Sequence, residues 1–201
     1  MSTARALPSL APWGELVPGA RPMTVEDLLA HPDDGYRYEV VEGALVRVAG
    51  SRPKAGRVTR RLYHRLDGFV RERGLGTVTL PDEVYDFERT GQPNTGLLPD
   101  IGFYYAFREA LVEDDQPYPF APDLAIEVAS PLQKPDAMAA KARRYLRGGT
   151  ALVWIVWIEE QLVDVWRPGD DRPSSTLTVG DQLDGEQVVP GFLCPVGVIL
   201  G

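Results

Sequence analysis

The chain has 201 residues, 44% of them hydrophobic and 25% charged, which is typical of globular proteins and excludes collagen-like and wholly disordered classes. Acidic residues outnumber basic ones by 29 to 21, and the net charge of −8 disfavours general attraction to nucleic-acid backbones and acidic membrane surfaces. Two histidines and one cysteine are too few for a zinc finger or a disulfide framework.

The sequence carries no signal for a membrane location or for export. The longest apolar run, Ala151 to Ile158, is far shorter than the ~20 residues that span a bilayer, and the first 22 residues hold no continuous apolar stretch. With no disulfide to form, a reducing compartment suits the chain. We therefore expect a cytoplasmic protein with no membrane partner.

The N-terminal segment differs in character from the rest of the chain. Residues 1–22 contain four prolines and no hydrophobic periodicity, so we expect an irregular arm there, followed by a single domain over residues 23–201. Thr24 is a typical helix N-cap, and the apolar residues after it predict a short helix that ends before Pro32.

A hairpin is predicted next. Tyr36 to Val41 and Ala44 to Val48 are β-branched and aromatic runs, and Glu42-Gly43 between them suits a two-residue turn.

A basic helix follows the hairpin. Apolar residues recur at helical spacing from Val58 to Val70, and Gly74 is a typical helix stop. Six arginines against Asp67 and Glu72 give this segment a charge of +4. Arg57, Arg60 and Arg61 fall mainly opposite the apolar stripe, where they are candidate nucleic-acid contacts; the alternative is an ordinary solvated face.

The rest of the chain is dominated by strands with one clear helix. Strand composition or alternation marks residues 77–80, 84–87, 97–105, 123–129, 151–158, 161–167 and 175–179. The segment Pro135 to Arg147 predicts a helix, with proline at its start and Gly148 after its end. Together the elements predict an α+β (α/β) protein.

Two carboxylates stand in otherwise apolar strands. Asp100 lies in Leu98-Pro99-Asp100-Ile101, and Glu127 lies in the run Leu124 to Ala129. A carboxylate among apolar neighbours costs desolvation energy unless a positive group satisfies it. Two such strands side by side would aim both carboxylates at one point, as Mg²⁺ or Mn²⁺ requires for phosphodiester hydrolysis.

A lysine and a third carboxylate complete the candidate site. Met138, Ala142 and Tyr145 define the apolar stripe of the predicted helix, and Lys141 lies at its edge, where it can reach the carboxylate pair. Such a lysine would orient the attacking water or stabilise charge on the phosphate. Glu39 in the hairpin is a further candidate for a supporting ligand or base.

Each of these residues also has a structural explanation. Asp100 and Glu127 could face solvent or pair with an arginine, Lys141 could extend along its helix to water, and Glu39 could be exposed on the hairpin. Only the combination of these residues favours a site over the structural explanations.

The order of these motifs resembles the Uma family of restriction-endonuclease-like proteins, which belongs to the PD-(D/E)XK nuclease superfamily. The most specific matches are the hairpin Tyr38-Glu39-Val40-Val41-Glu42-Gly43 and the strand Ala121-Pro122-Asp123 through Ser130-Pro131, with Leu98-Pro99-Asp100-Ile101, Lys141 and Tyr145 in support. The similarity covers about residues 22 to 200.

The resemblance implies a restriction-endonuclease-like mixed sheet flanked by helices, with an N-terminal helix and hairpin. It implies a metal held by Asp100, Glu127 and the main-chain carbonyl of Val128, with Lys141 supplied from the helix because the usual lysine position is Ala129. It also implies a role for Glu39 in the site.

The chain departs from the family before the basic helix, where relatives commonly carry a histidine and the stretch Ser51 to Arg57 has none. The leading hypothesis is a Mg²⁺- or Mn²⁺-dependent endonuclease acting on DNA, in a homodimer. The alternative is a catalytically inactive nuclease-fold protein that serves as a dimeric interaction or DNA-binding module.

Overall fold

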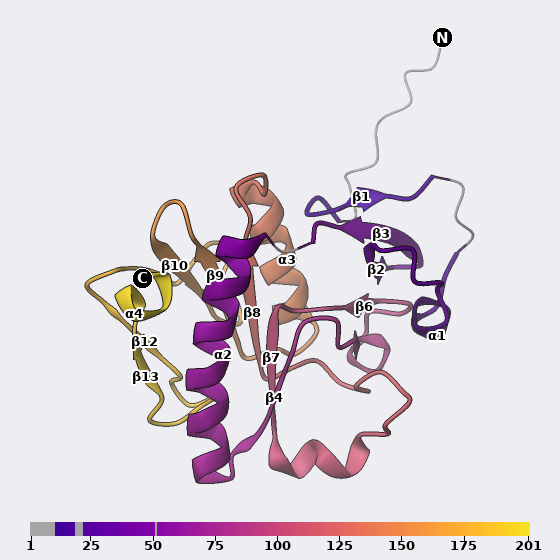
Figure 1. Cartoon of the computed structure of the whole chain (residues 1–201). Coiled ribbons are helices and arrows are strands. Elements are labelled where there is room, and N and C mark those ends of the chain that lie inside the picture. The colour runs from indigo at the N-terminus through magenta and orange to yellow at the C-terminus, as the bar shows by residue number, and fades with distance from the viewer. Residues whose placement is uncertain (1–10, 19–21, 51) are drawn as a thin grey trace.

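The computed structural model describes residues 11–18, 22–50 and 52–201, which form two sheets, a two-stranded ribbon and their covering helices (Figure 1). The larger sheet has six strands in the order β11-β10-β9-β8-β7-β4. These strands are β4 (Gly76–Thr79), β7 (Ile101–Tyr105), β8 (Leu124–Ala129), β9 (Leu152–Trp157), β10 (Leu162–Trp166) and β11 (Ser175–Thr178).

One parallel pair lies at the centre of the larger sheet. β8 and β9 run parallel, and every other neighbouring pair in this sheet is antiparallel. Parallel neighbours need a long connection, and helix α3 (Pro135–Arg147) provides it. This crossover carries α3 back across the sheet, beside the strands that hold the acidic residues.

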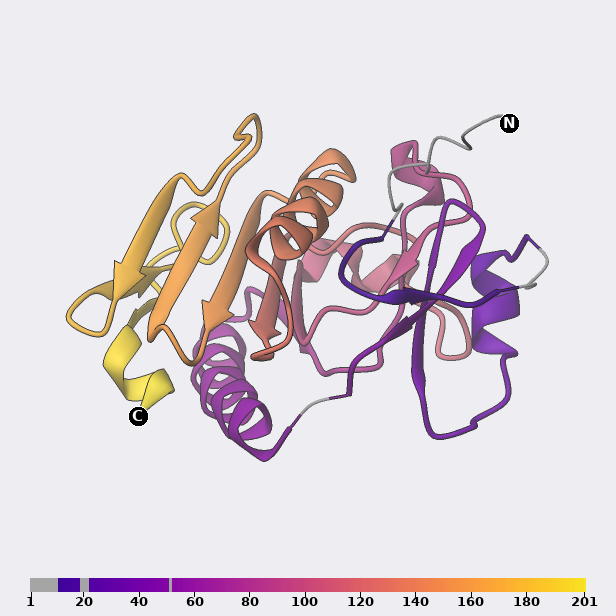
Figure 2. The same ribbon diagram turned by 90° about the horizontal axis from the view of Figure 1, so that it is seen from above.

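The two faces of the larger sheet are covered by different helices, as Figure 2 shows. Leu124, Ile126 and Val128 of β8 pack in the same cluster as the apolar side of α2 (Pro53–Arg73), whereas Ala125 and Ala129 pack with α3. Successive strand residues point to opposite faces, so the residue between these alanines also projects toward α3.

The smaller sheet is N-terminal, with the order β1-β3-β2-β6-β5. Its strands are β1 (Glu15–Leu16), β2 (Arg37–Val41), β3 (Ala44–Val48), β5 (Tyr85–Asp86) and β6 (Gly96–Leu97). Helix α1 (Val25–Leu29) packs beside it, and Thr24 caps this helix in a reciprocal capping box with Asp27.

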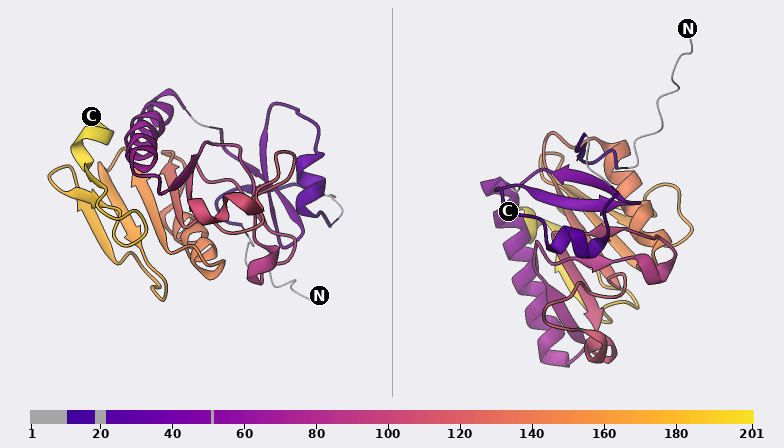
Figure 3. Two further views of the ribbon diagram at one scale, coloured as in Figure 1. Left: turned by 90° about the horizontal axis from the view of Figure 1, so that it is seen from below. Right: turned by 90° about the vertical axis from the view of Figure 1, so that its right-hand side faces the viewer.

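The C-terminal elements lie at the other end of the molecule from the smaller sheet (Figure 3). They are the ribbon of β12 (Gln182–Asp184) and β13 (Leu193–Pro195), followed by helix α4 (Val196–Leu200). Apolar residues of these elements and of the connection between β12 and β13, including Leu183, Phe192 and Ile199, complete the core on the α2 side. Short 3-10 helices, η1 (Glu88–Thr90) and η2 (Ala106–Leu111), occupy two of the connections.

The expected mixed α+β architecture is confirmed, including the hairpin, the basic helix and the helix over residues 135–147. Three expectations are corrected. The strand predicted over residues 97–105 is broken between Leu97 and Ile101, where Pro99 cannot donate to a ladder, so β6 and β7 belong to different sheets. The 3-10 helix η2 lies in a stretch expected to be a loop. The elements after Val179 were not predicted, because each spans only a few residues.

The remaining correction, after those to the strand over residues 97–105 and to the loop that holds η2, concerns the N-terminal arm. Glu15 and Leu16 form β1, paired with Arg47 and Val46, so this part of the expected irregular arm is a sheet strand. Residues 1–10 and 19–21 lie outside the described residues, and the single-domain boundary at residue 23 stays a prediction. Within the described ranges, no helix is both long and apolar enough to cross a membrane.

Candidate active site

The two strand carboxylates meet where β7 and β8 run side by side. Ile101 pairs with Ile126, and continuing this antiparallel register by one residue puts Asp100 next to Glu127. Asp100 Oδ2 accepts a hydrogen bond of 2.8 Å from the backbone N–H of Val128. Both side chains are buried. The register of neighbouring strands therefore brings together two charges that are distant in the sequence.

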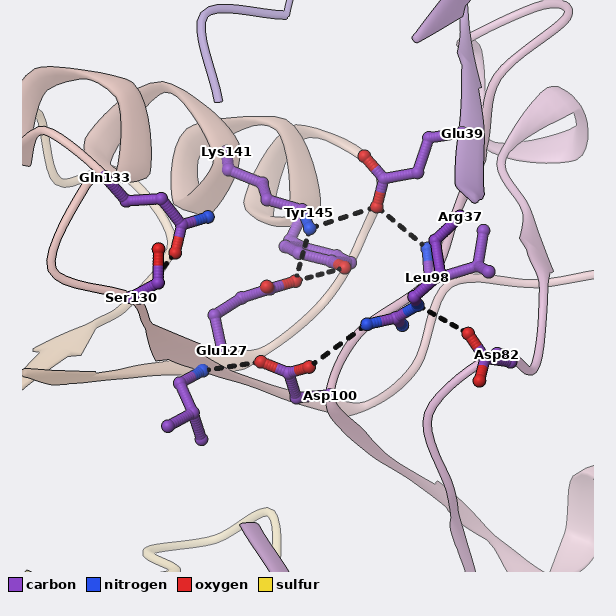
Figure 4. Close-up of polar contacts among 11 residues, drawn as sticks. Arg37, Glu39, Asp82, Leu98, Asp100, Glu127, Ser130, Gln133, Lys141 and Tyr145 are labelled. Atoms are coloured by element: carbon purple, nitrogen blue, oxygen red, sulfur yellow. Dashed lines mark hydrogen bonds and ion pairs between the residues drawn. The ribbon is translucent and has the colours of Figure 1, made fainter. Parts of the chain in front are cut away.

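Lys141 reaches this pair from α3. Its Nζ lies 2.8 Å from Glu127 Oε1 and 3.0 Å from Glu39 Oε1 (Figure 4). Tyr145, one helical turn after Lys141, donates its hydroxyl to the same Glu127 oxygen at 2.8 Å. Lys141 is only 4% exposed, so its charge is satisfied by carboxylates and hardly by water.

Glu39 joins the site from the N-terminal hairpin. Besides Lys141, its carboxylate accepts the backbone N–H of Leu98 at 3.1 Å and the indole N–H of Trp13 at 2.6 Å. Trp13 precedes β1 and is buried. The smaller sheet and the segment leading into it thus contribute directly to a site otherwise built on the larger sheet.

Arg37 lies beside Asp100 in the lining of the carboxylate cavity. Two residues before Glu39 in β2, it shares that residue's strand face. Its Nη1 is 3.6 Å from Asp100 Oδ1, and its Nε is 2.5 Å from Asp82 Oδ1. As Figure 4 shows, the guanidinium therefore stands between the two aspartates.

The site residues perturb one another's protonation. Burial raises the pKa of Glu127 from 4.5 to about 7, a shift that Lys141 opposes and the charges of Asp100 and Glu39 support. Burial alone would lower the pKa of Lys141, but Glu127 and Glu39 outweigh it and hold that pKa well above its ordinary value. Lys141 is therefore a fixed cation, whereas Glu127 titrates near neutral pH.

A small cavity of about 30 Å³ is lined by Asp100, Glu127, Val128, Ser130 and Lys141 among others. This is room for about two water-sized groups. The Ser130 hydroxyl is buried and has no hydrogen-bond partner among the described residues.

The backbone carbonyl of Val128 faces the same edge of β8 as Asp100. In an extended strand the N–H and C=O of one residue point to the same side, and the N–H of Val128 donates to Asp100.

These donors fit a small, hard cation. Two carboxylates and a carbonyl, with water and phosphate oxygens in the remaining positions, are typical of protein Mg²⁺ sites. Across the described ranges there is no group of three or more His, Cys, Asp or Glu side chains arranged to hold a metal ion. Such a cation would therefore rely on the carbonyl and on water to complete its coordination.

A family model with the description "putative restriction endonuclease", Uma2, matches residues 25–197. The chain belongs to the Uma2 family. A solved structure of a putative nuclease belonging to DUF820 from Anabaena variabilis ATCC 29413 is similar over 89% of this chain and 98% of its own, at 19% identity and a TM-score of 0.73. At that identity the likeness shows a shared fold. No curated protein sequence matches the chain.

The three arginines predicted to bind nucleic acid lie on α2 of this Uma2 chain, and all are exposed. Arg60 borders a groove that also contains Arg37. Arg61 donates to the carbonyl of Ile199 at 3.4 Å, so it also holds the C-terminal helix. None of the three lines the carboxylate cavity.

Three residues of the Uma2 site escaped sequence reasoning. Arg37 could have been found, because a residue two positions from Glu39 in a strand shares its face. Tyr145 supports the family resemblance and belongs to the apolar stripe, but the sequence alone gives it no role in the site, although its spacing from Lys141 places both on one side of α3. Trp13 gave no signal, since nothing in a proline-rich segment reveals a tertiary hydrogen bond.

Proposed function

We propose that this protein is a Mg²⁺- or Mn²⁺-dependent endonuclease that hydrolyses phosphodiester bonds in DNA. Its membership of a putative restriction endonuclease family supports a nuclease. The observation that carries the proposal is the buried Lys141 ammonium held between Glu127 and Glu39, beside Asp100. A desolvated cation next to a carboxylate pair is an arrangement suited to phosphoryl chemistry.

Asp100, Glu127 and the carbonyl of Val128 would hold the cation. When bound, a hard divalent cation supplies Lewis acidity toward a phosphate oxygen and acidifies water. Ser130 lines the same cavity, and its hydroxyl is buried without a hydrogen-bond partner among the described residues. Burial raises the pKa of Glu127 because it disfavours the charged carboxylate. A cation bound beside Glu127 would stabilise that charged form.

Lys141 would orient the attacking water or donate to a phosphate oxygen as negative charge accumulates on it. Its ammonium is pre-positioned, because two carboxylates and the wall of α3 leave it little freedom. Glu39 acts through Lys141 as a positioning residue. Leu98 and Trp13 fix its carboxylate in turn, so the hairpin determines where the ammonium stands.

DNA would approach along the exposed side of α2, where Arg57 and Arg60 can contact the flanking phosphates. The net charge of −8 makes general DNA affinity weak, so binding should depend on the metal and on salt. We also propose the homodimer and the cytoplasmic location expected from the sequence; light scattering of the purified chain tests the dimer.

Cleavage of supercoiled plasmid tests the proposal. In Mg²⁺ or Mn²⁺ the wild type should nick or linearise the plasmid, and EDTA should stop the reaction. Glu127→Gln and Lys141→Met should each lose on the order of 100-fold or more in rate. Glu72→Gln, an exposed change at the end of α2, is the control and should cleave like the wild type. Equal cleavage by Glu127→Gln and wild type would refute the assignment, and failure to bind Mn²⁺ supports the inactive alternative.

A further inference from the structure

A second, larger cavity lies beside the carboxylate site. This groove has a volume of about 540 Å³, within the range of small-molecule sites. One wall is the N-terminal half of α2, and the other is the segment Leu80–Asp82 that follows β4. Tyr63 and Leu80 give it apolar sides, and nothing in the cleavage chemistry uses it.

Two features of α2 bear on what the groove can hold. A Cβ added at Gly56 would meet nothing within 4 Å, so the helix presents open space where most residues would place a side chain. One turn on, Thr59 is only 7% exposed, and its hydroxyl has no hydrogen-bond partner within the described part of the chain. A buried, unpaired hydroxyl costs free energy, and a rotation of the Thr59 side chain toward the groove would let a bound polar group recover it.

Arg37 connects the groove to the carboxylate site, because its side chain lines both cavities. On one side it faces Asp100, and on the other it pairs with Asp82, whose charge it offsets (Figure 4). Arg60 adds a second guanidinium on the groove. The rim is therefore compatible with a phosphodiester backbone, while the interior is apolar and aromatic.

We infer that the groove binds a nucleobase of the substrate strand, next to the phosphate held at the carboxylates. The base would lie against Tyr63 and Leu80, with Thr59 available to an edge of the base and Arg37 to the adjoining phosphate. An aromatic wall combined with arginines on the rim is the combination that binds unpaired nucleotides. This inference rests on the proposed function for its ligand, but the groove can be tested without cleavage.

The test measures stacking directly. A short single-stranded oligonucleotide carrying 2-aminopurine, an adenine analogue whose fluorescence falls when it stacks, is titrated with the full chain in EDTA and again in Ca²⁺. The wild type should quench the probe. Gly56→Leu should fill the groove, abolish the quenching and weaken binding by on the order of tenfold. Tyr63→Leu should do the same by removing the aromatic wall.

The matched control is Gly68→Leu. Gly68 lies on the same helix, is exposed and also has open space around it, but does not line the groove. Both substitutions favour the helix, so neither should impair folding. Equal quenching by Gly56→Leu and Gly68→Leu overturns the inference, as does the absence of quenching by the wild type in both buffers. Plasmid cleavage by the same wild-type sample separates the two claims. Quenching without cleavage overturns only the proposed function. Cleavage without quenching overturns only the inference that the groove binds a nucleobase.

Discussion

The Nζ of Lys141 lies 2.8 Å from Oε1 of Glu127, although one residue comes from a helix and the other from the strand before it. The family resemblance of the sequence implies that the usual position of the lysine is two residues after the glutamate. Here that position is Ala129, which packs into the core against α3. The chain therefore delivers its ammonium to the glutamate from the neighbouring helix.

Removing Lys141 should destabilise the fold as well as stop cleavage. Lys141→Met leaves Glu127 and Glu39 as buried carboxylates without their cation, at a cost of about 3–5 kcal/mol in the free energy of unfolding. Adding Glu127→Gln to that variant should recover part of the loss, because one unpaired charge disappears. Urea denaturation of the two variants in EDTA measures this difference, and a double variant less stable than Lys141→Met contradicts the assignment.

Stability without metal should depend on pH through Glu127. Its pKa is about 7 in the folded chain and 4.5 ordinarily, so the folded state holds more protons between those values. The free energy of unfolding should therefore fall as the pH rises from about 5 to 7, by on the order of 1–3 kcal/mol from this group. Glu127→Gln should lack that part of the slope, which urea midpoints across the pH range will show. Parallel slopes for the two proteins argue against the shift.

Glu127 should also make the affinity for metal depend on pH: affinity should rise as the pH rises, whereas stability without metal should fall. A ligand must lose its proton before it can bind a cation, so Mn²⁺ affinity should weaken as the pH falls below about 7. Calorimetry in buffers of different ionisation enthalpy should also reveal proton release at pH 6. Affinity that stays constant between pH 6 and 8 places Glu127 outside the metal site.

Arg37 should oppose metal binding. Its guanidinium lies 3.6 Å from Asp100 Oδ1, where it repels an incoming cation. Arg37→Gln keeps the polar character of the side chain but removes the charge, so Mn²⁺ should bind several-fold more tightly. Arg47→Gln, at an exposed ion pair with Glu15 in the same sheet, is the matched control and should bind Mn²⁺ like the wild type. Weaker binding by Arg37→Gln would show that the arginine organises the site.

Trp13 should stabilise the chain through its hydrogen bond to Glu39. Trp13→Phe keeps an aromatic ring but leaves a buried carboxylate oxygen unsatisfied, at a cost of about 1–3 kcal/mol. Trp166→Phe is the matched control, because the Trp166 indole N–H is buried without a partner among the described residues. Thermal unfolding compares the two, and an equal loss in both variants would assign the effect to ring size alone.

Local patterns account for much of the fold. The hairpin, the basic helix and the helix over residues 135–147 follow from short-range signals: a two-residue turn at Glu42-Gly43, apolar spacing of 3.6 residues, and a proline start. The break at Pro99 was visible in principle, since proline cannot donate to a strand ladder, yet the apolar run around it concealed the change of sheet.

The sequence by itself determined which residues are candidates for the site. A carboxylate in an apolar strand is costly unless it is paired, which made Asp100 and Glu127 candidates. The place of Lys141 at the edge of an apolar helix stripe added the lysine to them. Only the tertiary structure decided how they meet: the register of β7 on β8 sets Asp100 beside Glu127, and the crossover returns Lys141 to that face. Arg37 and Trp13 became part of the site in the same way. Register and crossover join residues far apart in the chain, so no local pattern encodes their distances.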